Sequence, residues 1–324
     1  MTTWLLTGGA GYIGAHVIRS LQASGRDVVV LDDLSTGLAR KVPEGVPLLE
    51  VNVGDKPAVT AALRDHDVAG VVHLAAKKAV GESVERPEYY YRENVDGMLS
   101  LLEAMAEAGT RNFVYSSSAA VYGTPAEEFV SEDAVLAPES PYGQTKVIGE
   151  WMTRNAAVNR ELSWISLRYF NVAGAASPEL GDTSVFNLIP MVFRALREGK
   201  RPQVFGDDYP TPDGTCIRDY IHVSDLAQAH LLALRWLMAG RPSRVFNLGN
   251  GAGFSVREVI AAVEAVTGRP VPHRIAPRRA GDPPVLVADA ARAREELGWV
   301  PARPGLETQI ADAHAWFRRT RQIG

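Results

Sequence analysis

The sequence predicts an α/β protein with a doubly wound parallel sheet and a smaller, mixed α/β domain toward the C-terminus. In the first half of the 324-residue chain, short apolar segments alternate with segments of helical periodicity. This alternation is typical of βαβ units, whose parallel sheet is covered by helices on both faces. Residues 173–220 are instead rich in Gly, Pro and Asp, which indicates a change of architecture in the second half.

The expected strands are short apolar runs, and the expected helices carry apolar residues at helical spacing. In the first half we expect strands over 4–7, 28–32, 48–53, 70–76, 112–118 and 164–172, and helices over 13–23, 93–108 and 142–158. In the second half we expect helices over 185–198, 224–239, 255–267, 289–297 and 305–320, and a strand over 244–249.

The composition is that of an ordinary globular protein, with 46% hydrophobic and 22% charged residues. A net charge of −4 gives no reason to expect a nucleic-acid partner. No apolar run reaches the roughly 20 residues of a membrane helix, and the N-terminal sequence lacks the basic segment of a signal peptide. One cysteine, Cys216, can form neither an internal disulfide nor a thiolate metal cluster. We therefore expect a cytoplasmic protein with no metal and no membrane contact.

A glycine-rich turn lies between the first expected strand and the first expected helix. The segment TGGAGYIG over 7–14 places Gly8, Gly11 and Gly14 at three-residue spacing. Such a turn lets a pyrophosphate approach the backbone, and the following helix N-terminus offers free N–H groups. The next strand ends at Asp32, where a carboxylate hydrogen bonds an adenosine ribose and repels a 2′-phosphate. The combination predicts a Rossmann-type sheet that binds NAD rather than NADP.

The domain boundaries follow from this prediction and from the change of composition. We expect the NAD-binding domain to cover 1–172, with 221–249 rejoining it. We expect the second domain to consist of 173–220 and 250–324.

A tyrosine and a lysine stand one helical turn apart in SPYGQTK, over 140–146. Tyr142 and Lys146 then share one face of a helix. A nearby ammonium and an oxidised nicotinamide would both lower the pKa of the Tyr142 phenol, making it a base. Ser118, at the end of the strand before, can hydrogen bond a substrate hydroxyl. Tyr/Lys pairs are also common on solvated helices. The catalytic interpretation of this pair therefore depends on the dinucleotide turn and the serine-rich strand end.

Several longer motifs extend this pattern. They are HLAAKKAVGES (73–83), YSSSAAVYG (115–123), RYFNVAGA (168–175), DGTCIRDYIHVSDLA (213–227) and RRAGD (278–282), with TGGAGYIG and SPYGQTK. On these motifs the chain resembles the extended short-chain dehydrogenase/reductase family over almost its whole length and, within it, the UDP-glucose 4-epimerases. The resemblance implies reversible C4 epimerisation of a UDP-hexose through a 4-keto intermediate, with tightly bound NAD.

The resemblance also implies a role for each matching residue. Cofactor contacts are expected from Gly8, Gly11, Tyr12, Ile13, Gly14, Asp32, Asn52, Val53, Ala75, Ala76, Lys78, Asn94, Ser116, Tyr142, Lys146 and Tyr169, and catalytic roles from Tyr142, Lys146 and Ser118. Contacts with the UDP-sugar are expected from Ser118, Asn171, Asn187, Leu188, Phe205, Arg218, Arg279, Asp282 and Leu286. Guanidinium groups suit a diphosphate, although Arg278 and Arg279 taken alone would be a solvated basic loop.

The chain departs from the pattern of the family at two places. Asn52-Val53 stands where these enzymes commonly carry Gly-Asp followed by Ile or Leu, and an asparagine can still hydrogen bond adenine. Leu286 replaces a bulky tyrosine found in some relatives beside the sugar. The smaller side chain leads to the hypothesis that the N-acetylated pair of UDP-hexosamines is also accepted.

Three other functions are compatible with parts of the pattern. A UDP-pentose or UDP-uronate 4-epimerase would share most of these residues. A nucleotide-sugar dehydratase would need an Asp-Glu pair directly after the serine, where this chain has Ala119 and Ala120. A non-catalytic NAD sensor on the same fold often loses the Tyr/Lys pair, which this chain keeps.

A homodimer is expected by analogy with the same family. In relatives, the helices that correspond to 93–108 and 142–158 pair across a two-fold axis. Their apolar residues Leu99, Leu102, Val147 and Trp151 would either form that interface or face the sheet.

Overall fold

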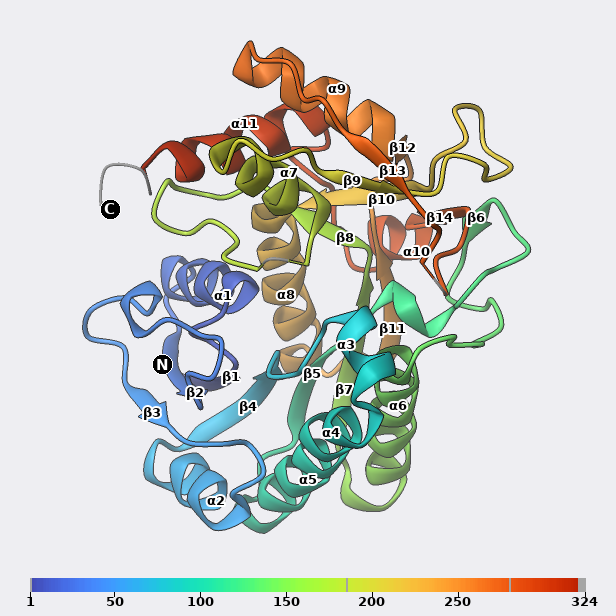
Figure 1. The fold of residues 1–324 in the computed structure, drawn as a ribbon. Helices are drawn as coiled ribbons and strands as arrows, with labels where there is room; N and C mark the ends of the chain where they lie inside the picture. The colour runs from blue at the N-terminus through green and yellow to red at the C-terminus, as the bar shows by residue number, and fades with distance from the viewer. Residues whose placement is uncertain (1, 185, 280, 320–324) are drawn as a thin grey trace.

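Seven parallel strands form the large sheet of the computed structural model, which describes residues 2–184, 186–279 and 281–319 (Figure 1). In spatial order they are β11 (Arg244–Leu248), β7 (Ser163–Tyr169), β5 (Asn112–Ser116), β4 (Val68–His73), β1 (Thr3–Thr7), β2 (Asp27–Asp32) and β3 (Leu48–Glu50). The strand order reverses between β1 and β4, and ligands of such sheets bind at this switch point. The predicted doubly wound α/β class is confirmed.

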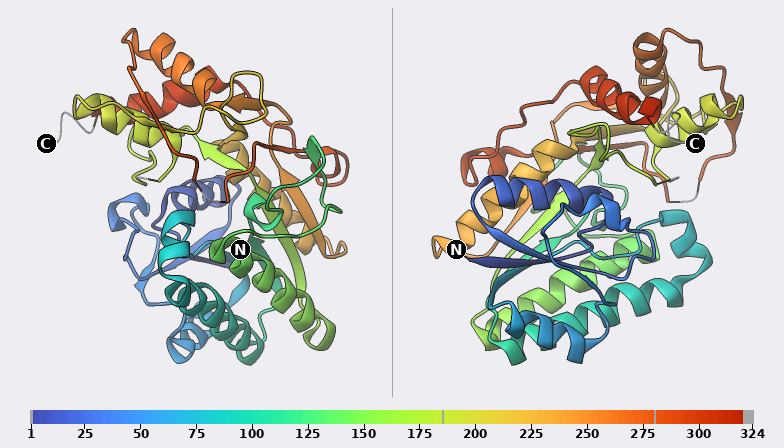
Figure 2. Two further views of the ribbon diagram at one scale, coloured as in Figure 1. Left: turned by 45° about the vertical axis from the view of Figure 1, so that its right-hand side comes forward. Right: turned by 90° about the vertical axis from the view of Figure 1, so that its left-hand side faces the viewer.

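Helices cover both faces of this sheet because its strands are apolar on both sides. Along β1, Trp4 and Leu6 pack in the core on one face, whereas Leu5 packs in the core on the opposite face. Figure 2 shows the two helical layers on either side of the sheet. The first layer consists of α1 (Tyr12–Ala23) and α8 (Val223–Met238), and the second of α2 (Lys56–Asp65), α5 (Gly97–Ala108) and α6 (Pro141–Arg160).

A smaller sheet, centred on β10, lies above the carboxyl ends of the large one (Figure 1). It contains β12 (Gly253–Ser255), β10 (Ile217–His222), β14 (Val285–Ala288) and β6 (Phe129–Val130), and β8 (Asn171–Ala173) also pairs with β10. β9 (Gln203–Phe205) and β13 (Arg274–Ala276) form a separate pair. The helices α7 (Leu188–Arg197), α9 (Val256–Thr267) and α11 (Leu306–Arg319) share a third hydrophobic core with β10.

Several elements differ from the sequence prediction. The segment 164–172 is not one strand: the Phe170 N–H bonds the Leu248 carbonyl, and from Asn171 onward the chain pairs with β10 instead of β11. The predicted helix over 93–108 begins as a π-helical segment, Arg92–Asp96, before α5. Elements that the prediction missed include α2, α3 (Val80–Glu85), α4 (Pro87–Tyr91), β6, β9, β10 and β12–β14. α10 (Ala291–Glu295) is shorter than predicted.

These missed elements are short or depend on partners far away in the sequence. β6 has two residues and pairs with β14, so no local periodicity marks it. Within the described parts of the chain, we find no helix that is both long and apolar enough to cross a membrane.

Candidate active site

The glycine turn brings backbone from two strands close together at the switch point. Gly8 has a φ of +72°, and a Cβ there would lie 2.7 Å from the Ala75 nitrogen after β4. A Cβ on Gly14 would lie 2.5 Å from the Gly8 carbonyl oxygen. Helix α1 begins at Tyr12 after Gly11, and no described side chain caps it. Its first N–H groups are therefore free for an anion, so the turn fits a pyrophosphate.

Asp32 ends β2 and holds the turn from the other side. Its side chain is 6% exposed, and its two oxygens accept the N–H groups of Ala10 and Leu34, each at 2.9 Å. Burial raises the pKa of Asp32, and these hydrogen bonds oppose the rise. A carboxylate has about four lone-pair sites, so ribose hydroxyls can still donate to it. The predicted Asp32 site fits an adenosine ribose.

The remaining predicted cofactor residues differ in burial and in how many hydrogen bonds they already make within the protein. Asn94 is buried and bridges the backbone of Lys77 to the Thr145 hydroxyl, with contacts of 2.8–3.0 Å. Asn52 donates to Asp33 at 3.1 Å. Ala75 and Ala76 follow β4, and Lys78 is exposed. The side chains of Ile13 and Val53 instead pack against the two hydrophobic cores of the large sheet.

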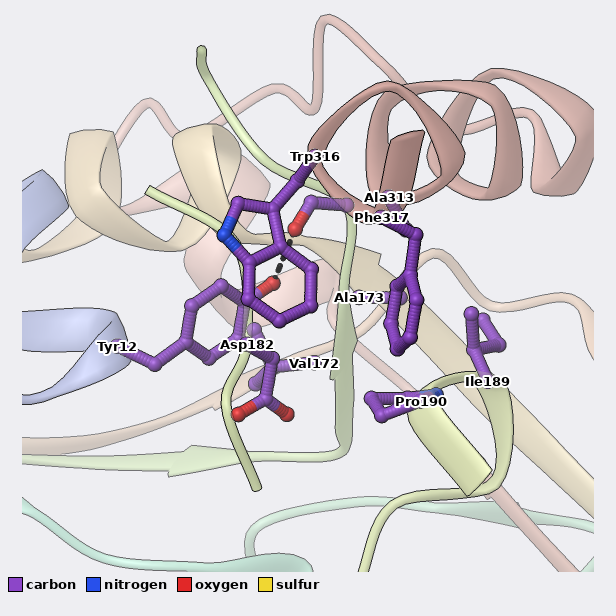
Figure 3. Close-up of a pocket in the computed structure, with 10 residues that line it drawn as sticks. Tyr12, Val172, Ala173, Asp182, Ile189, Pro190, Ala313, Trp316 and Phe317 are labelled. Carbon is purple, nitrogen blue, oxygen red and sulfur yellow. Dashed lines mark hydrogen bonds between the residues drawn. The ribbon is translucent and has the colours of Figure 1, made fainter. Parts of the chain in front are cut away.

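The Tyr12 side chain points away from the glycine turn, toward Gly174. Its hydroxyl donates to the Gly174 carbonyl oxygen at 2.5 Å, and its ring lines a pocket shared with Asp182 and Trp316 (Figure 3). This pocket lies between α1 and α11, so the Tyr12 side chain packs against the C-terminal helix. Its backbone N–H, at the start of α1, belongs to the uncapped first turn that could hold an anion.

Ser118, Tyr142 and Lys146 come together at the carboxyl ends of β5 and β7. Helix α6 starts after Ser140, whose hydroxyl accepts the Gly143 N–H at 3.1 Å. One turn of α6 then aligns Tyr142, hydrogen bonded to Ser118, with Lys146. The Lys146 Nζ donates to the Ser116 carbonyl oxygen at 2.8 Å and lies 5.9 Å from the centroid of the Tyr142 ring.

Burial dominates the electrostatics of this group in the protein alone. Burial raises the pKa of Tyr142, and the hydrogen bond with Ser118 opposes the rise. Burial also lowers the pKa of Lys146 to about 7, against the attraction of Glu150. The predicted lowering of the Tyr142 pKa involves an oxidised nicotinamide as well as Lys146, so it stays a prediction. Both groups are less than 10% exposed, and desolvation outweighs their mutual effect.

Tyr169 and Ser116 complete the floor of the site. Tyr169, at the end of β7, is hydrogen bonded to Ser116, and burial raises its pKa. The Ser116 hydroxyl also lies 3.2 Å from Nε2 of His230 on α8. These residues extend the catalytic group toward the centre of the sheet.

Four of the predicted UDP-sugar residues form a second cluster, from the end of β9, from β10 and from the loop after β13. The Arg279 guanidinium lies 4.5 Å from the centroid of the Phe205 ring and donates to Asp282 at 3.0 Å. Arg218, on β10, lies 3.7 Å from the other oxygen of Asp282. Arg279 is half exposed, whereas Arg278 pairs with Asp208 and stacks on Tyr209. The structure thus brings together the two cations, the ring and the carboxylate.

Leu286 lies between the two clusters. It is directly opposite Arg218 in the pairing of β10 with β14, and its side chain packs with Ala119 and Val147 near the catalytic group. Asn171 is hydrogen bonded to Tyr220, Asn187 donates to Asp182 at 2.6 Å, and Leu188 begins α7 against its core. Asn187 and Leu188 are thus next to residues that line the pocket at Tyr12: Asn187 bonds Asp182, and Leu188 precedes Ile189.

Two residues that the sequence prediction missed belong to this neighbourhood. Glu150, one turn after Lys146, is fully buried, and the spacing of Tyr142, Lys146 and Glu150 was a readable signal. Lys77 donates to the Ser35 hydroxyl at 2.7 Å, beside the loop after Asp32. Only the fold shows that contact, because the two residues lie on different strand ends.

Comparison with known proteins agrees with this geometry. A family model described as the NAD dependent epimerase/dehydratase family matches residues 4–249. The UDP-glucose 4-epimerase of Azospirillum brasilense is 47% identical over 98% of this chain and 92% of its own length. A solved UDP-glucose 4-epimerase from Stenotrophomonas maltophila, with bound NAD and formylated UDP-arabinopyranose, superposes with a TM-score of 0.95 at 41% identity and covers both chains fully. The Brucella ovis UDP-glucose 4-epimerase in complex with NAD gives a TM-score of 0.94 at 42% identity, over 98% of this chain and 99% of its own. This chain therefore belongs to the NAD dependent epimerase/dehydratase family.

Proposed function

We propose that this protein catalyses the reversible inversion of C4 in a UDP-hexose, interconverting UDP-galactose and UDP-glucose with tightly bound NAD. The observation that carries the proposal is the convergence of Ser118, Tyr142 and Lys146 at the sheet edge that also bears the glycine turn. The relatives are UDP-glucose 4-epimerases by name, which supports the same reaction.

The cofactor residues provide binding and orientation. The glycine turn and α1 would hold the pyrophosphate, Asp32 the adenosine ribose, and Lys146 the nicotinamide ribose. When bound, NAD supplies a reversible acceptor for the C4 hydride. Because nothing is consumed over a full cycle, the cofactor can stay bound.

The proton is handled by Tyr142. As the phenolate it removes the proton of the C4 hydroxyl, while Ser118 hydrogen bonds the same oxygen and keeps it in line. Loss of this proton together with the C4 hydride would give a 4-keto sugar, which would turn about its link to the diphosphate and present its other face before both are returned. Tyr142 then returns the proton to the oxygen at C4, now with inverted configuration.

The UDP cluster would provide the fixed end of that rotation. Arg218 and Arg279 suit the diphosphate, Phe205 suits the uracil ring and Asp282 suits ribose hydroxyls. Arg279 now contacts both Phe205 and Asp282, so nucleotide binding requires it to exchange these contacts for the phosphates. Strong contacts to UDP and few to the hexose allow the sugar to turn.

The test is conversion of UDP-galactose by the purified protein with no NAD added. Turnover supports an epimerase that retains its cofactor. Binding of NAD without turnover on any UDP-sugar would instead support a sensor. A panel of UDP-hexoses, UDP-pentoses and UDP-uronates separates the remaining epimerase alternatives, and release of a dehydrated keto sugar would indicate a dehydratase.

We further propose that the N-acetylated pair is accepted as well. Leu286 packs beside Ala119 and Val147 with a side chain smaller than tyrosine, which leaves width next to the sugar. A larger 2-acetamido group is the chemical difference between the two substrate pairs.

The proposed organisation is a cytoplasmic homodimer of two-domain subunits. The NAD-binding domain would comprise 1–172 and 221–249, and the UDP-sugar domain 173–220 and 250–324. On α5 and α6, Leu99 and Trp151 are 49% and 54% exposed, whereas Leu102 and Val147 are buried. The exposed pair is thus available to an interface between α5 and α6 of two subunits.

A further inference from the structure

Three consecutive serines at the end of β5 face three successive turns of α6. Ser118 is hydrogen bonded to Tyr142, the Ser116 carbonyl accepts from Lys146 at 2.8 Å, and the Ser117 hydroxyl donates to Oε1 of Glu150 at 2.7 Å. The proposed mechanism uses the first two of these contacts. The third belongs to a buried carboxylate with no role in it so far.

Gly149 places α6 directly against the Tyr115 side chain of β5, where these contacts form. A Cβ on Gly149 would overlap the Tyr115 hydroxyl, so a larger residue would require the buried Tyr115 ring to move. The contact at Glu150 is one of the contacts that hold α6 against this end of β5.

Glu150 is held rigidly by a second strand. Arg168, on β7, donates from Nε to Oε1 at 2.8 Å and from Nη2 to Oε2 at 2.6 Å. The two side chains are 0% and 1% exposed. Arg168 donates in addition to the Tyr122 hydroxyl at 2.9 Å and to the Glu132 carbonyl at 3.0 Å. A buried ion pair gives little net stability compared with apolar packing, so stability alone does not explain why this pair is present.

We propose, on the basis of the function proposed above, that Glu150 is a positioning residue for Lys146: it seats α6 against β5 and supplies the negative charge that keeps Lys146 cationic. The Lys146 ammonium can then hold the nicotinamide ribose and favour the phenolate of Tyr142. Glu150 does not touch the substrate or the reacting atoms in this role.

The charges around Lys146 support this assignment. The titratable and charged groups that face it are Tyr142 and Glu150 on α6, His73 on β4, Tyr115 on β5, Arg168 and Tyr169 on β7, and His230 on α8. Burial lowers the pKa of His73 to about 3 and of His230 to about 4, so both are neutral near neutral pH. Burial raises the pKa of all three tyrosines. Glu150 is therefore the one anion of this set, and its cationic partners are Arg168 at 2.6 Å and the half-exposed Arg154 at 3.5 Å.

The sign of the expected pH effect follows directly. Burial lowers the pKa of Lys146 to about 7, and Glu150 opposes that fall. Activity that needs the ammonium is lost as pH rises through this pKa. Removing the charge of Glu150 lowers the pKa further, and the unpaired Arg168 acts in the same direction. The alkaline limb of the activity profile should then move to lower pH.

The test compares Glu150→Gln with the unmodified holoenzyme. We expect the alkaline limb of kcat to move down by about one pH unit, the smaller end of the range for one nearby charge. The fraction of nucleotide that the holoenzyme retains through gel filtration should fall over the same, lower pH range. Glu150→Asp keeps the charge and should restore the limb, even where it lowers kcat.

Asp225→Asn is the matched control. Asp225 is also a buried carboxylate, and it accepts the N–H groups of Ala302 and Arg303, each at 2.9 Å, far from α6. The control should lower the melting temperature and leave the alkaline limb in place. Glu150→Gln with a lowered melting temperature and an unmoved limb would overturn the proposal, because Glu150 would then be structural alone.

Two complications have separate readouts. If Glu150→Gln does not fold, the pair Glu150→Gln with Arg168→Met removes both buried charges, and an unmoved limb in that variant also overturns the proposal. If the unmodified protein fails to convert UDP-galactose, the proposed function fails, while nucleotide retention against pH still tests Glu150. A shift in retention for Glu150→Gln, absent in Asp225→Asn, would support the assignment in that case.

Discussion

The side chains of Tyr142 and Ser118 are hydrogen bonded to each other, although one lies in the first turn of α6 and the other just beyond β5. The contact exists because α6 crosses the carboxyl end of β5 at close range. It gives the phenol a fixed partner in a buried position, where burial otherwise raises its pKa. The fold therefore fixes the position of the Tyr142 hydroxyl but does not by itself make it more acidic.

Tyr142→Phe removes the proposed base while keeping the ring. We expect kcat to fall by about 10²–10⁴-fold, the usual contribution of a positioned acid–base group. Affinity for UDP, measured by calorimetry, should stay within about twofold, since UDP would bind at the Arg279 cluster. Turnover close to that of the unmodified enzyme would remove Tyr142 from the mechanism.

Lys146 makes stability depend on pH in the nucleotide-free protein. Its pKa is 10.5 in an exposed setting and about 7 in the fold, so between these values the unfolded chain binds more protons. Stability should therefore rise with pH across this window. Lys146→Met has no such dependence. The difference in free energy of unfolding between this variant and the unmodified protein, measured by urea unfolding, should therefore change by at least about 1 kcal/mol in favour of the unmodified protein as pH rises across the window. A constant difference would contradict the buried-ammonium interpretation.

Gly14→Ala tests the close packing of the turn. The added Cβ would meet the Gly8 carbonyl oxygen and the Gly9 Cα at 2.5 and 2.6 Å, both of them backbone atoms that cannot turn aside. We expect a loss of bound NAD of at least about tenfold in affinity or a melting temperature lower by several degrees. Gly81→Ala is the control, because a Cβ there meets nothing within 4 Å. Equal behaviour of the two variants would refute the close packing.

Leu286→Tyr tests the width of the sugar site. We expect turnover of UDP-N-acetylgalactosamine to fall by about tenfold or more, while UDP-galactose turnover changes little. The melting temperature must be recorded as well, because Leu286 is 8% exposed and overpacking also destabilises. The hypothesis fails if the unmodified enzyme acts on UDP-galactose alone and the substitution changes nothing.

Trp151→Glu tests the proposed dimer. A charge at this half-exposed position on α6 would be buried in an interface between two α5–α6 pairs, which is costly. The expected result is a monomer by size-exclusion chromatography with light scattering, where the unmodified protein is a dimer. Val300→Glu, at an apolar residue 72% exposed outside α5 and α6, should leave the mass unchanged. A Trp151→Glu protein with the same mass as the unmodified one would exclude this interface.

The sequence by itself determined the class of the fold and the centre of the site. Alternating apolar and helical segments, the spacing of Gly8, Gly11 and Gly14, and the one-turn separation of Tyr142 and Lys146 are all local patterns. Local patterns survive in the sequence because backbone preference and side-chain periodicity act over a few residues. For the same reason the resemblance to a family could be stated from short motifs.

Only the tertiary structure decided which distant residues meet and how their charges behave. β7 ends at Tyr169 opposite Leu248, because from Asn171 onward the chain pairs with β10 instead, and Arg218 lies beside Leu286 because β10 pairs with β14. The direction of the Tyr142 pKa could not be read from its spacing to Lys146, since desolvation depends on every element packed around the phenol. The partnership of Glu150 with Arg168 has the same origin: two strands and a helix must be in place before either charge is buried.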